Sequence, residues 1–107
     1  KGKIRGFAFR VPLTCGSVTE FTIETNKPVT EEKVNSAVKV AAKGPLKGII
    51  EYSTDELVST DILGNPHSAI FDSKLTTVID KKFLHVVAWY DNEWGYSSRM
   101  VDMIKIL

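Results

Sequence analysis

The chain has 107 residues, of which 43% are hydrophobic and 25% are charged, and its 14 basic and 13 acidic residues give a net charge of +1. This composition indicates a soluble globular domain and excludes a disordered chain, while the near balance of charge gives no case for nucleic-acid binding. The apolar runs are far shorter than the roughly 20 residues of a membrane-spanning helix, and the single cysteine, Cys15, favours a reducing compartment. We therefore expect a cytoplasmic protein with no nucleic-acid or membrane partner.

The N-terminal part of the chain predicts two strands. Residues 4–11 and 17–25 are rich in β-branched and aromatic side chains, and residues 12–16, which contain Pro12 and Gly16, separate them. Polar and apolar residues alternate imperfectly in the second segment. This pattern is typical of a strand with one wetter face.

Residues 30–43 give the clearest helix signal. Thr30 can cap the N-terminus, and glutamates in the first turn complement the positive end of the helix dipole. Gly44 and Pro45 end the helix. One apolar stripe runs along it, formed by Val34, Ala37, Val38 and Ala41.

The remaining sequence predicts closely spaced short strands and then a second helix. The segment 53–67 reads as a mostly irregular connection with room for a short strand around Val58. Short links favour antiparallel pairing, and after Gly95 the apolar spacing changes to that of a helix. The expected fold class is α+β, a mostly antiparallel sheet covered by helices, one of them C-terminal. The expected strands after the first helix are 48–52, 68–72, 75–80 and 83–90.

The strand 83–90 looks buried on both faces, yet only two helices are available to cover the whole sheet. Further cover has to come from another part of the subunit, from a partner subunit, or from both.

The junction between the strand 83–90 and the C-terminal helix concentrates aromatic and amide groups in the run WYDNEWGYSSR, residues 89–99. Asn92 lies in the loop just before the helix, where its amide can offer both a donor and an acceptor to a flat ligand. The alternative is that Asn92 only caps the helix or closes the turn.

Arg10 follows an apolar segment and precedes Val11 and Pro12, so its guanidinium is expected near a strand end. A guanidinium there suits bidentate recognition of a phosphate. Taken alone, an arginine at a strand end is more often solvated or paired with a carboxylate.

Several motifs together resemble glyceraldehyde-3-phosphate dehydrogenase and its close relative erythrose-4-phosphate dehydrogenase. The run WYDNEWGYSSRMVD (residues 89–102) is similar to the C-terminal signature of this family. Four more segments match the family in the same order, so that the resemblance covers essentially the whole chain: GFAFRVP (6–12), KPVT (27–30), LKGI (46–49) and SAIFD (68–72).

The resemblance implies an NAD-dependent, phosphorylating aldehyde dehydrogenase of glycolysis that acts as a homotetramer. Its substrates would be glyceraldehyde 3-phosphate and inorganic phosphate. By the same resemblance, Arg10 would bind the substrate phosphate and Asn92 would bind the nicotinamide carboxamide of NAD. Tyr96 would lie on the nicotinamide side of that pocket.

The resemblance also implies that residues 1–107 are the C-terminal portion of a catalytic domain. The fingerprint Gly-x-Gly-x-x-Gly of a Rossmann domain is absent from the sequence, and so is the family's nucleophile motif Ser-Cys-Thr-Thr-Asn. Cys15 lies in a loop between strands and is expected to be a bystander, and neither His67 nor His85 matches the family's general base. No residue of this chain is therefore expected to be catalytic, no metal site is expected, and the chain alone is expected to be inactive.

Two alternatives stay open. The first keeps the enzyme class and changes the substrate to erythrose 4-phosphate; NPHSAI (65–70) fits both families, whereas the pair Trp89-Tyr90 favours the triose enzyme. The second is a non-catalytic interaction or assembly fragment that docks through an apolar strand.

Overall fold

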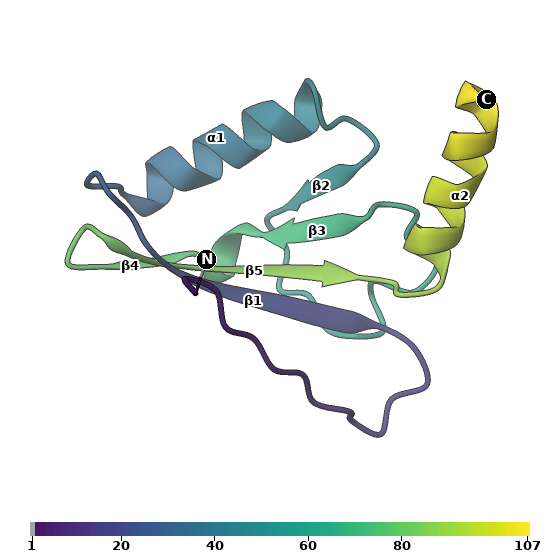
Figure 1. Cartoon of the computed structure of the whole chain (residues 1–107), viewed down its shortest axis with the longest axis horizontal. Helices are drawn as coiled ribbons and strands as arrows, with labels where there is room; N and C mark the ends of the chain where they lie inside the picture. The colour runs from purple at the N-terminus through teal and green to yellow at the C-terminus, as the bar shows by residue number, and fades with distance from the viewer. Residues whose placement is uncertain (1) are drawn as a thin grey trace.

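The run of aromatic and β-branched residues at Phe83–Tyr90 forms the central strand, β5 (Figure 1). The structure is a computed structural model that describes residues 2–107. β1 (Ser17–Glu24) pairs with β5 in antiparallel register along its whole length, from Ser17 opposite Tyr90 to Glu24 opposite Phe83. This ladder brings the start of β1 beside the end of β5, where the candidate site lies.

Three short strands complete a five-stranded sheet of order β1-β5-β3-β2, with β4 pairing to β5. The pairs formed by β5 are antiparallel, whereas β2 and β3 are parallel, so the sheet is mostly antiparallel as predicted. The segment between β2 and β3 is long enough for the crossover that a parallel pair requires. The three strands are β2 (Ile50–Ser53), β3 (Ala69–Asp72) and β4 (Thr77–Ile79).

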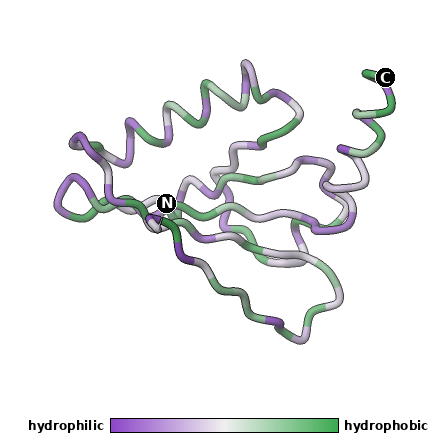
Figure 2. The backbone as a smooth tube through the Cα atoms, viewed as in Figure 1, coloured by the Kyte–Doolittle hydropathy of each residue, from purple (hydrophilic) through white to green (hydrophobic). Residues whose placement is uncertain are grey.

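β4 is shorter than the predicted strand 75–80 because the short 3₁₀ helix η1 (Ser73–Leu75) precedes it. At its other end, a turn reverses the chain into β5. Asp80 and Lys81 adopt φ values of 51° and 59° in this turn, a conformation that places two polar residues at the tip of the hairpin. Figure 2 shows the same tip as a hydrophilic loop.

The predicted first helix is confirmed as α1 (Glu31–Lys43). Thr30 caps it by accepting a hydrogen bond from the Lys33 backbone N–H at 3.3 Å. Asn35 fixes the helix to the short segment between β3 and β4, since its Nδ2 donates to the Ser73 carbonyl at 3.1 Å and its Oδ1 accepts from the Thr76 hydroxyl at 2.8 Å. Polar and apolar residues alternate along α1 in Figure 2, as expected for a helix with one face toward the sheet.

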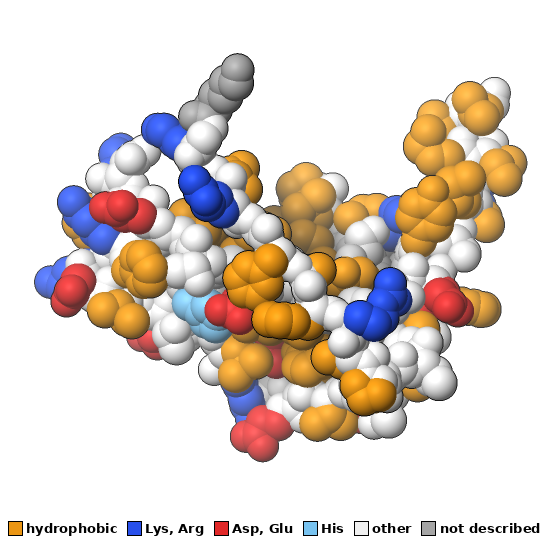
Figure 3. Space-filling view, turned by 60° about the horizontal axis from the view of Figure 1, so that its bottom comes forward, with side chains coloured by type: hydrophobic (Ala, Val, Ile, Leu, Met, Phe, Trp, Pro, Cys, Tyr) orange, Lys and Arg blue, Asp and Glu red, His pale blue; other side chains and the backbone are white. Residues whose placement is uncertain are grey.

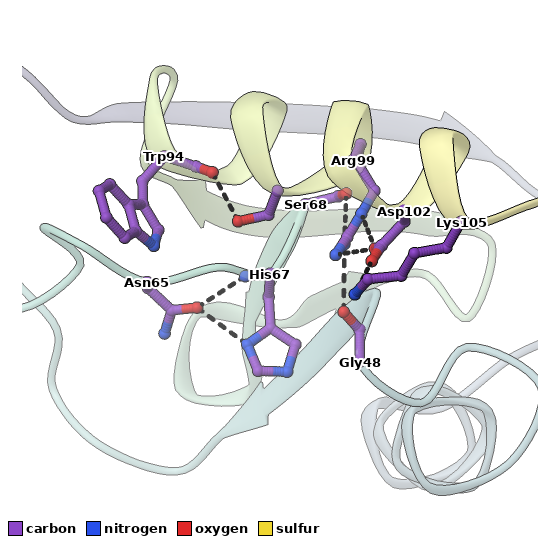
Figure 4. A network of polar contacts seen from close by, with 9 residues as sticks. Gly48, Asn65, His67, Ser68, Trp94, Arg99, Asp102 and Lys105 are labelled. Atoms are coloured by element: carbon purple, nitrogen blue, oxygen red, sulfur yellow. Dashed lines mark hydrogen bonds and ion pairs between the residues drawn. The ribbon is translucent and has the colours of Figure 1, made fainter.

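The second helix, α2 (Trp94–Ile106), rises from the end of β5 at the opposite side of the sheet from the β4–β5 hairpin (Figure 1). Arg99 holds it in place (Figure 4): its Nη1 donates to the Gly48 carbonyl at 3.1 Å and to the Ser68 hydroxyl at 3.3 Å. Its Nη2 lies 2.7 Å from an Asp102 carboxylate oxygen on the next turn. One guanidinium thus links α2 to the segments that enter β2 and β3.

The predicted strand at 4–11 is wrong. These residues belong to no strand, and the side chains of Ile4, Phe7 and Phe9 are 93%, 85% and 83% exposed. An alternating pattern becomes a strand only where a ladder partner is present, and no strand within residues 2–107 pairs with this segment. The suggested strand around Val58 is also absent, because Val58 donates its backbone N–H to the Asp61 carboxylate at 2.8 Å in an irregular turn.

The apolar core is small and lies around β3 and β5. It consists of Ile62, Ile70, Phe71, Leu84 and Val87. Only two of these belong to β5, so the expectation that β5 is buried on both faces holds in part. Apolar side chains gather instead on the outside of α2, which projects from the body in Figure 3. They include Met100, Met103, Ile104 and Ile106, each at least half exposed.

None of the helices within residues 2–107 is long and apolar enough to cross a membrane.

Candidate functional site

Asp91, the first residue after β5, organises the junction between β5 and α2. Its Oδ1 accepts the backbone N–H groups of Glu93 at 2.9 Å and Trp94 at 2.8 Å, which are free donors at the start of the helix. Its Oδ2 accepts the backbone N–H of Gly64 at 2.8 Å. The carboxylate therefore caps α2 and also binds the long connection between β2 and β3 through its hydrogen bond with Gly64.

The electrostatics of Asp91 follow from these bonds. The side chain is only 5% exposed, and the N–H groups of Trp94, Gly64 and Glu93 together lower its pKa from 3.8 to about 2, with burial opposing them. Backbone donors stabilise the charged form, so Asp91 stays ionised at neutral pH. It is a structural anion and not a proton donor.

Asn92 does not cap the helix, so the capping half of that alternative is wrong, whereas a purely structural role in joining the loops stays open. Its Oδ1 accepts the backbone N–H of Gly16 at 3.0 Å and the Ser17 hydroxyl at 3.2 Å, across the ladder that joins the start of β1 to the end of β5. Within the described residues, its Nδ2 donates no hydrogen bond to protein. The residue is exposed, so this amide nitrogen is available to a ligand.

The other two predicted site residues are not joined to Asn92 by hydrogen bonds or ion pairs within residues 2–107. Tyr96 lies in the first turn of α2 with 69% of its surface exposed. Arg10 lies in the exposed N-terminal segment and not at a strand end, because the predicted strand 4–11 does not form. Within residues 2–107 its guanidinium makes no hydrogen bond or ion pair.

Cys15 is joined to the site but is poorly suited to act as a nucleophile. Its thiol donates to Asp91 Oδ1 at 3.3 Å. Loss of water around the sulfur, followed by the neighbouring Asp91 carboxylate, raises the pKa of the Cys15 thiol above its ordinary value. A raised pKa lowers the thiolate fraction, which supports the interpretation of Cys15 as a bystander.

Both histidines make structural contacts. His85 in β5 lies 2.9 Å from a Glu20 carboxylate oxygen on the neighbouring strand, as expected for a hydrogen-bonded strand histidine. In Figure 4 the His67 ring faces Asn65, with its Nδ1 2.9 Å from Asn65 Oδ1. The same nitrogen lies 3.1 Å from a Glu51 carboxylate oxygen. Among residues 2–107, no group of three or more potential ligands is arranged to hold a metal ion.

An open groove of about 690 Å³ lies elsewhere, between α1 and β2. It is lined by side chains that include Lys39, Lys43, Tyr52 and His67, and by none of the predicted site residues. Its chemistry is therefore separate from that of the β5–α2 junction.

The sequence analysis missed Asp91, Gly16 and Ser17 as parts of this site. Asp91 could have been found from the pattern of an acidic residue shortly before a helix, which is a known capping signal. The contacts of Gly16 and Ser17 with Asn92 span 76 and 75 residues, so they depend on the strand pairing and not on any local signal.

The profile of the family described as glyceraldehyde 3-phosphate dehydrogenase, C-terminal domain, matches residues 1–92. The chain is 54% identical over all its 107 residues to a glyceraldehyde-3-phosphate dehydrogenase of Mycobacterium avium, of which it spans 31%. It is 50% identical to the testis-specific glyceraldehyde-3-phosphate dehydrogenase of Mus musculus, spanning 24%, and 51% identical over 106 residues to that of Kitasatospora aureofaciens, spanning 32%. The chain thus spans about a third or less of these relatives.

A match over residues 1–92, together with the α+β fold and the junction that carries the signature motif, shows that the chain belongs to the glyceraldehyde 3-phosphate dehydrogenase C-terminal domain family.

Proposed function

We propose that the chain is the C-terminal portion of the catalytic domain of an NAD-dependent, phosphorylating glyceraldehyde-3-phosphate dehydrogenase of glycolysis. The observation that carries this proposal is the identity of 54% over the entire chain to a protein of that name. The relatives are about three times as long, which supports a Rossmann domain supplied by the rest of the polypeptide. In this proposal the chain alone has no dehydrogenase activity.

The described residues fit part of NAD. NAD would supply the hydride acceptor, and Asn92 offers an exposed amide nitrogen that can hold the nicotinamide carboxamide. Tyr96 follows Asn92 by four residues, in the first turn of α2, and is 69% exposed. Holding the ring in one orientation is what these residues would contribute to hydride transfer.

Arg10 is the proposed ligand of the substrate phosphate. Its guanidinium has no protein partner within residues 2–107, and a free guanidinium suits a phosphate through two parallel hydrogen bonds. The exposed apolar side chains around it, those of Phe7 and Phe9, indicate that further protein covers this segment.

Kinetics of the intact subunit test the substrate assignment. Arg10→Ala should raise KM for glyceraldehyde 3-phosphate by about 10- to 100-fold, because a hydrogen bond to a charged group contributes about 1.5–3 kcal/mol. Unphosphorylated glyceraldehyde is the matched control, and its KM should stay within about 2-fold of wild type since it lacks the group that Arg10 binds. Equal effects on both aldehydes would exclude Arg10 as the phosphate ligand. Turnover of erythrose 4-phosphate above that of the triose would favour the alternative substrate.

The proposed enzyme is a cytoplasmic homotetramer, a state that would also explain the uncovered sheet and α2. The non-catalytic alternative is favoured by the same exposed apolar residues of α2. The two are separated by assaying the intact subunit, since an assembly fragment reduces no NAD in the presence of aldehyde and phosphate.

A further inference from the structure

The open groove between α1 and β2 lies at one edge of the sheet, since β2 is the last strand in the order β1-β5-β3-β2 (Figure 1). Its volume of about 690 Å³ falls within the range of pockets that hold small-molecule ligands, roughly 300–1,000 Å³. Ala42, Ile50 and Tyr52 supply apolar lining. The groove therefore suits a small ligand with an apolar or aromatic body.

Three lysines line the same groove at intervals of four residues. Lys39 and Lys43 lie on α1, and Lys47 lies in the turn segment that follows it. Within residues 2–107, none of the three ammonium groups forms an ion pair, whereas those of Lys74 and Lys105 do. Lys43 also offsets the negative end of the α1 dipole, so Lys39 and Lys47 are the cations most available to a ligand.

An aromatic ring holds the ammonium group of Lys39 in the groove. The Lys39 Nζ lies 5.5 Å from the centre of the Tyr52 ring, which is a cation–π distance. The Tyr52 ring is stacked in turn on Phe71, with the ring centres 5.9 Å apart and 22° between the ring planes. Because Phe71 is a buried core residue, the position of the Lys39 charge follows from the packing of the sheet.

The acidic residue of the lining, Glu51, does not neutralise the lysines. Its Oε2 accepts a hydrogen bond from Asn65 Nδ2 at 2.8 Å and lies 3.1 Å from His67 Nδ1. The Asn65 amide cannot be turned over, because its Oδ1 accepts the His67 backbone N–H at 2.9 Å. With His67 neutral, three lysines and one glutamate give the lining a net charge of +2.

We propose that this groove is a binding site for a small organic phosphate, a phosphate monoester on an apolar or aromatic body. The phosphate group carries a charge of about −1.5 to −2 at pH 7, which complements the charge of the lining. It contacts Lys39 and Lys47, and the body lies against Ile50 and Tyr52. Binding in the groove requires neither NAD nor Arg10, so this site goes beyond the proposed function.

Calorimetric titration of the intact subunit with phenyl phosphate, at saturating NAD, tests the site. We expect saturable binding with a Kd of about 1 mM or tighter. Inorganic phosphate, which lacks the ring, should bind at least about 3-fold more weakly, because the ring gains contacts with Tyr52. The absence of saturable binding would overturn the proposal, and equal binding of the two probes would overturn the proposed ligand class.

Lysine variants test the contacts with the phosphate group. Lys39→Met combined with Lys47→Met keeps the apolar stems and should weaken phenyl phosphate by about 5- to 20-fold, because two charged contacts are lost. The matched control combines Lys33→Met and Lys82→Met, two exposed lysines outside the groove. The control should lose less than about 2-fold, because distant exposed charges are screened. Equal losses in both double variants would show an effect of net charge alone and would overturn the proposal.

Two further variants test the sign of the charge effect and the place of binding. Glu51→Gln keeps an oxygen for Asn65 and removes a negative charge, so it should strengthen phenyl phosphate binding by about 2- to 5-fold. A variant that misfolds cannot bind more tightly, so this gain separates electrostatics from stability, and weaker binding would contradict the proposal. Arg10→Ala should leave the Kd unchanged, and a loss as large as that of the groove variants would place the phosphate at Arg10 and overturn the groove site.

Discussion

Replacing Asp91 by asparagine should destabilise the fold in a pH-dependent way. The carboxylate accepts three backbone N–H groups, from Gly64, Glu93 and Trp94, and asparagine has only one oxygen with which to replace two. The shift of the Asp91 pKa from 3.8 to about 2 corresponds to about 2 kcal/mol of stability, at roughly 1.4 kcal/mol per unit. Because the folded pKa is depressed, this contribution is complete above pH 3.8 and is lost as the pH falls through 3.8 toward 2.

Urea unfolding followed by circular dichroism, at intervals from pH 6 to pH 2, measures this contribution. We expect Asp91→Asn to be about 2 kcal/mol less stable than wild type at pH 6, with the gap narrowing toward pH 2. Asp80→Asn is the matched control, because Asp80 is exposed in a hairpin turn at positive φ, where asparagine is also well tolerated. If the difference in the free energy of unfolding between wild type and Asp91→Asn does not change with pH, the ionised carboxylate is not its cause. If the two proteins are equally stable, the helix cap formed by Asp91 does not stabilise the fold.

Two further substitutions test the packing around the site. Gly95→Ala places a Cβ 2.7 Å from the His67 carbonyl oxygen, so the start of α2 has to shift; we expect a net loss of about 1–3 kcal/mol in urea unfolding despite the better helix propensity of alanine. Gly6→Ala, with open space around the new Cβ, is its control, and equal stability of the two variants would contradict the close contact. Ile62→Ala deletes a side chain with 0% exposure and should cost about 2–5 kcal/mol in the same assay. The same change at Ile104, 69% exposed, should cost little, and similar losses at both sites would show that Ile62 is not in the core.

The sequence predicted those elements whose signals are local. The helix α1 was predicted within a residue of its bounds because Thr30, the first-turn glutamates and Gly44 mark its two ends chemically. The strand β5 was predicted with its observed bounds because its aromatic and β-branched run is long enough to exclude a turn. The segment 4–11 has the same kind of composition, but composition does not say whether a pairing strand is present, and residues 2–107 contain none.

In the candidate site, too, only the residues with a local sequence signal were predicted. Asn92 was proposed from its motif, and Arg10 from its residue type and the resemblance; both stay predictions. The residues that organise the site were not found, because their partners are distant in sequence: Asp91 meets Gly64 across 27 residues and Cys15 across 76. The Cys15 contact depends on the pairing of β1 with β5, and the Gly64 contact depends on the pairing of β3 with β5. Local reasoning therefore proposes Asn92 and misses the residues around it.

The arrangement of Asp91 and Asn92 leaves the Asn92 amide nitrogen exposed, as its proposed role in ligand binding requires. A polar side chain before a helix ordinarily accepts hydrogen bonds from the free N–H groups of the first turn. At this junction the carboxylate of Asp91 accepts those hydrogen bonds. Asn92 therefore does not cap the helix, and its Oδ1 instead accepts hydrogen bonds from Gly16 and Ser17 at the start of β1. The orientation of Asn92 depends on Asp91: without the Asp91 cap, we expect the amide of Asn92 to accept the free N–H groups of the helix, and its nitrogen would no longer be presented outward. If Asn92 binds the dinucleotide as proposed, Asp91→Asn should weaken dinucleotide binding to the intact subunit although Asp91 is not a proposed ligand contact, and adding Asn92→Ala to it should cost less than Asn92→Ala does alone.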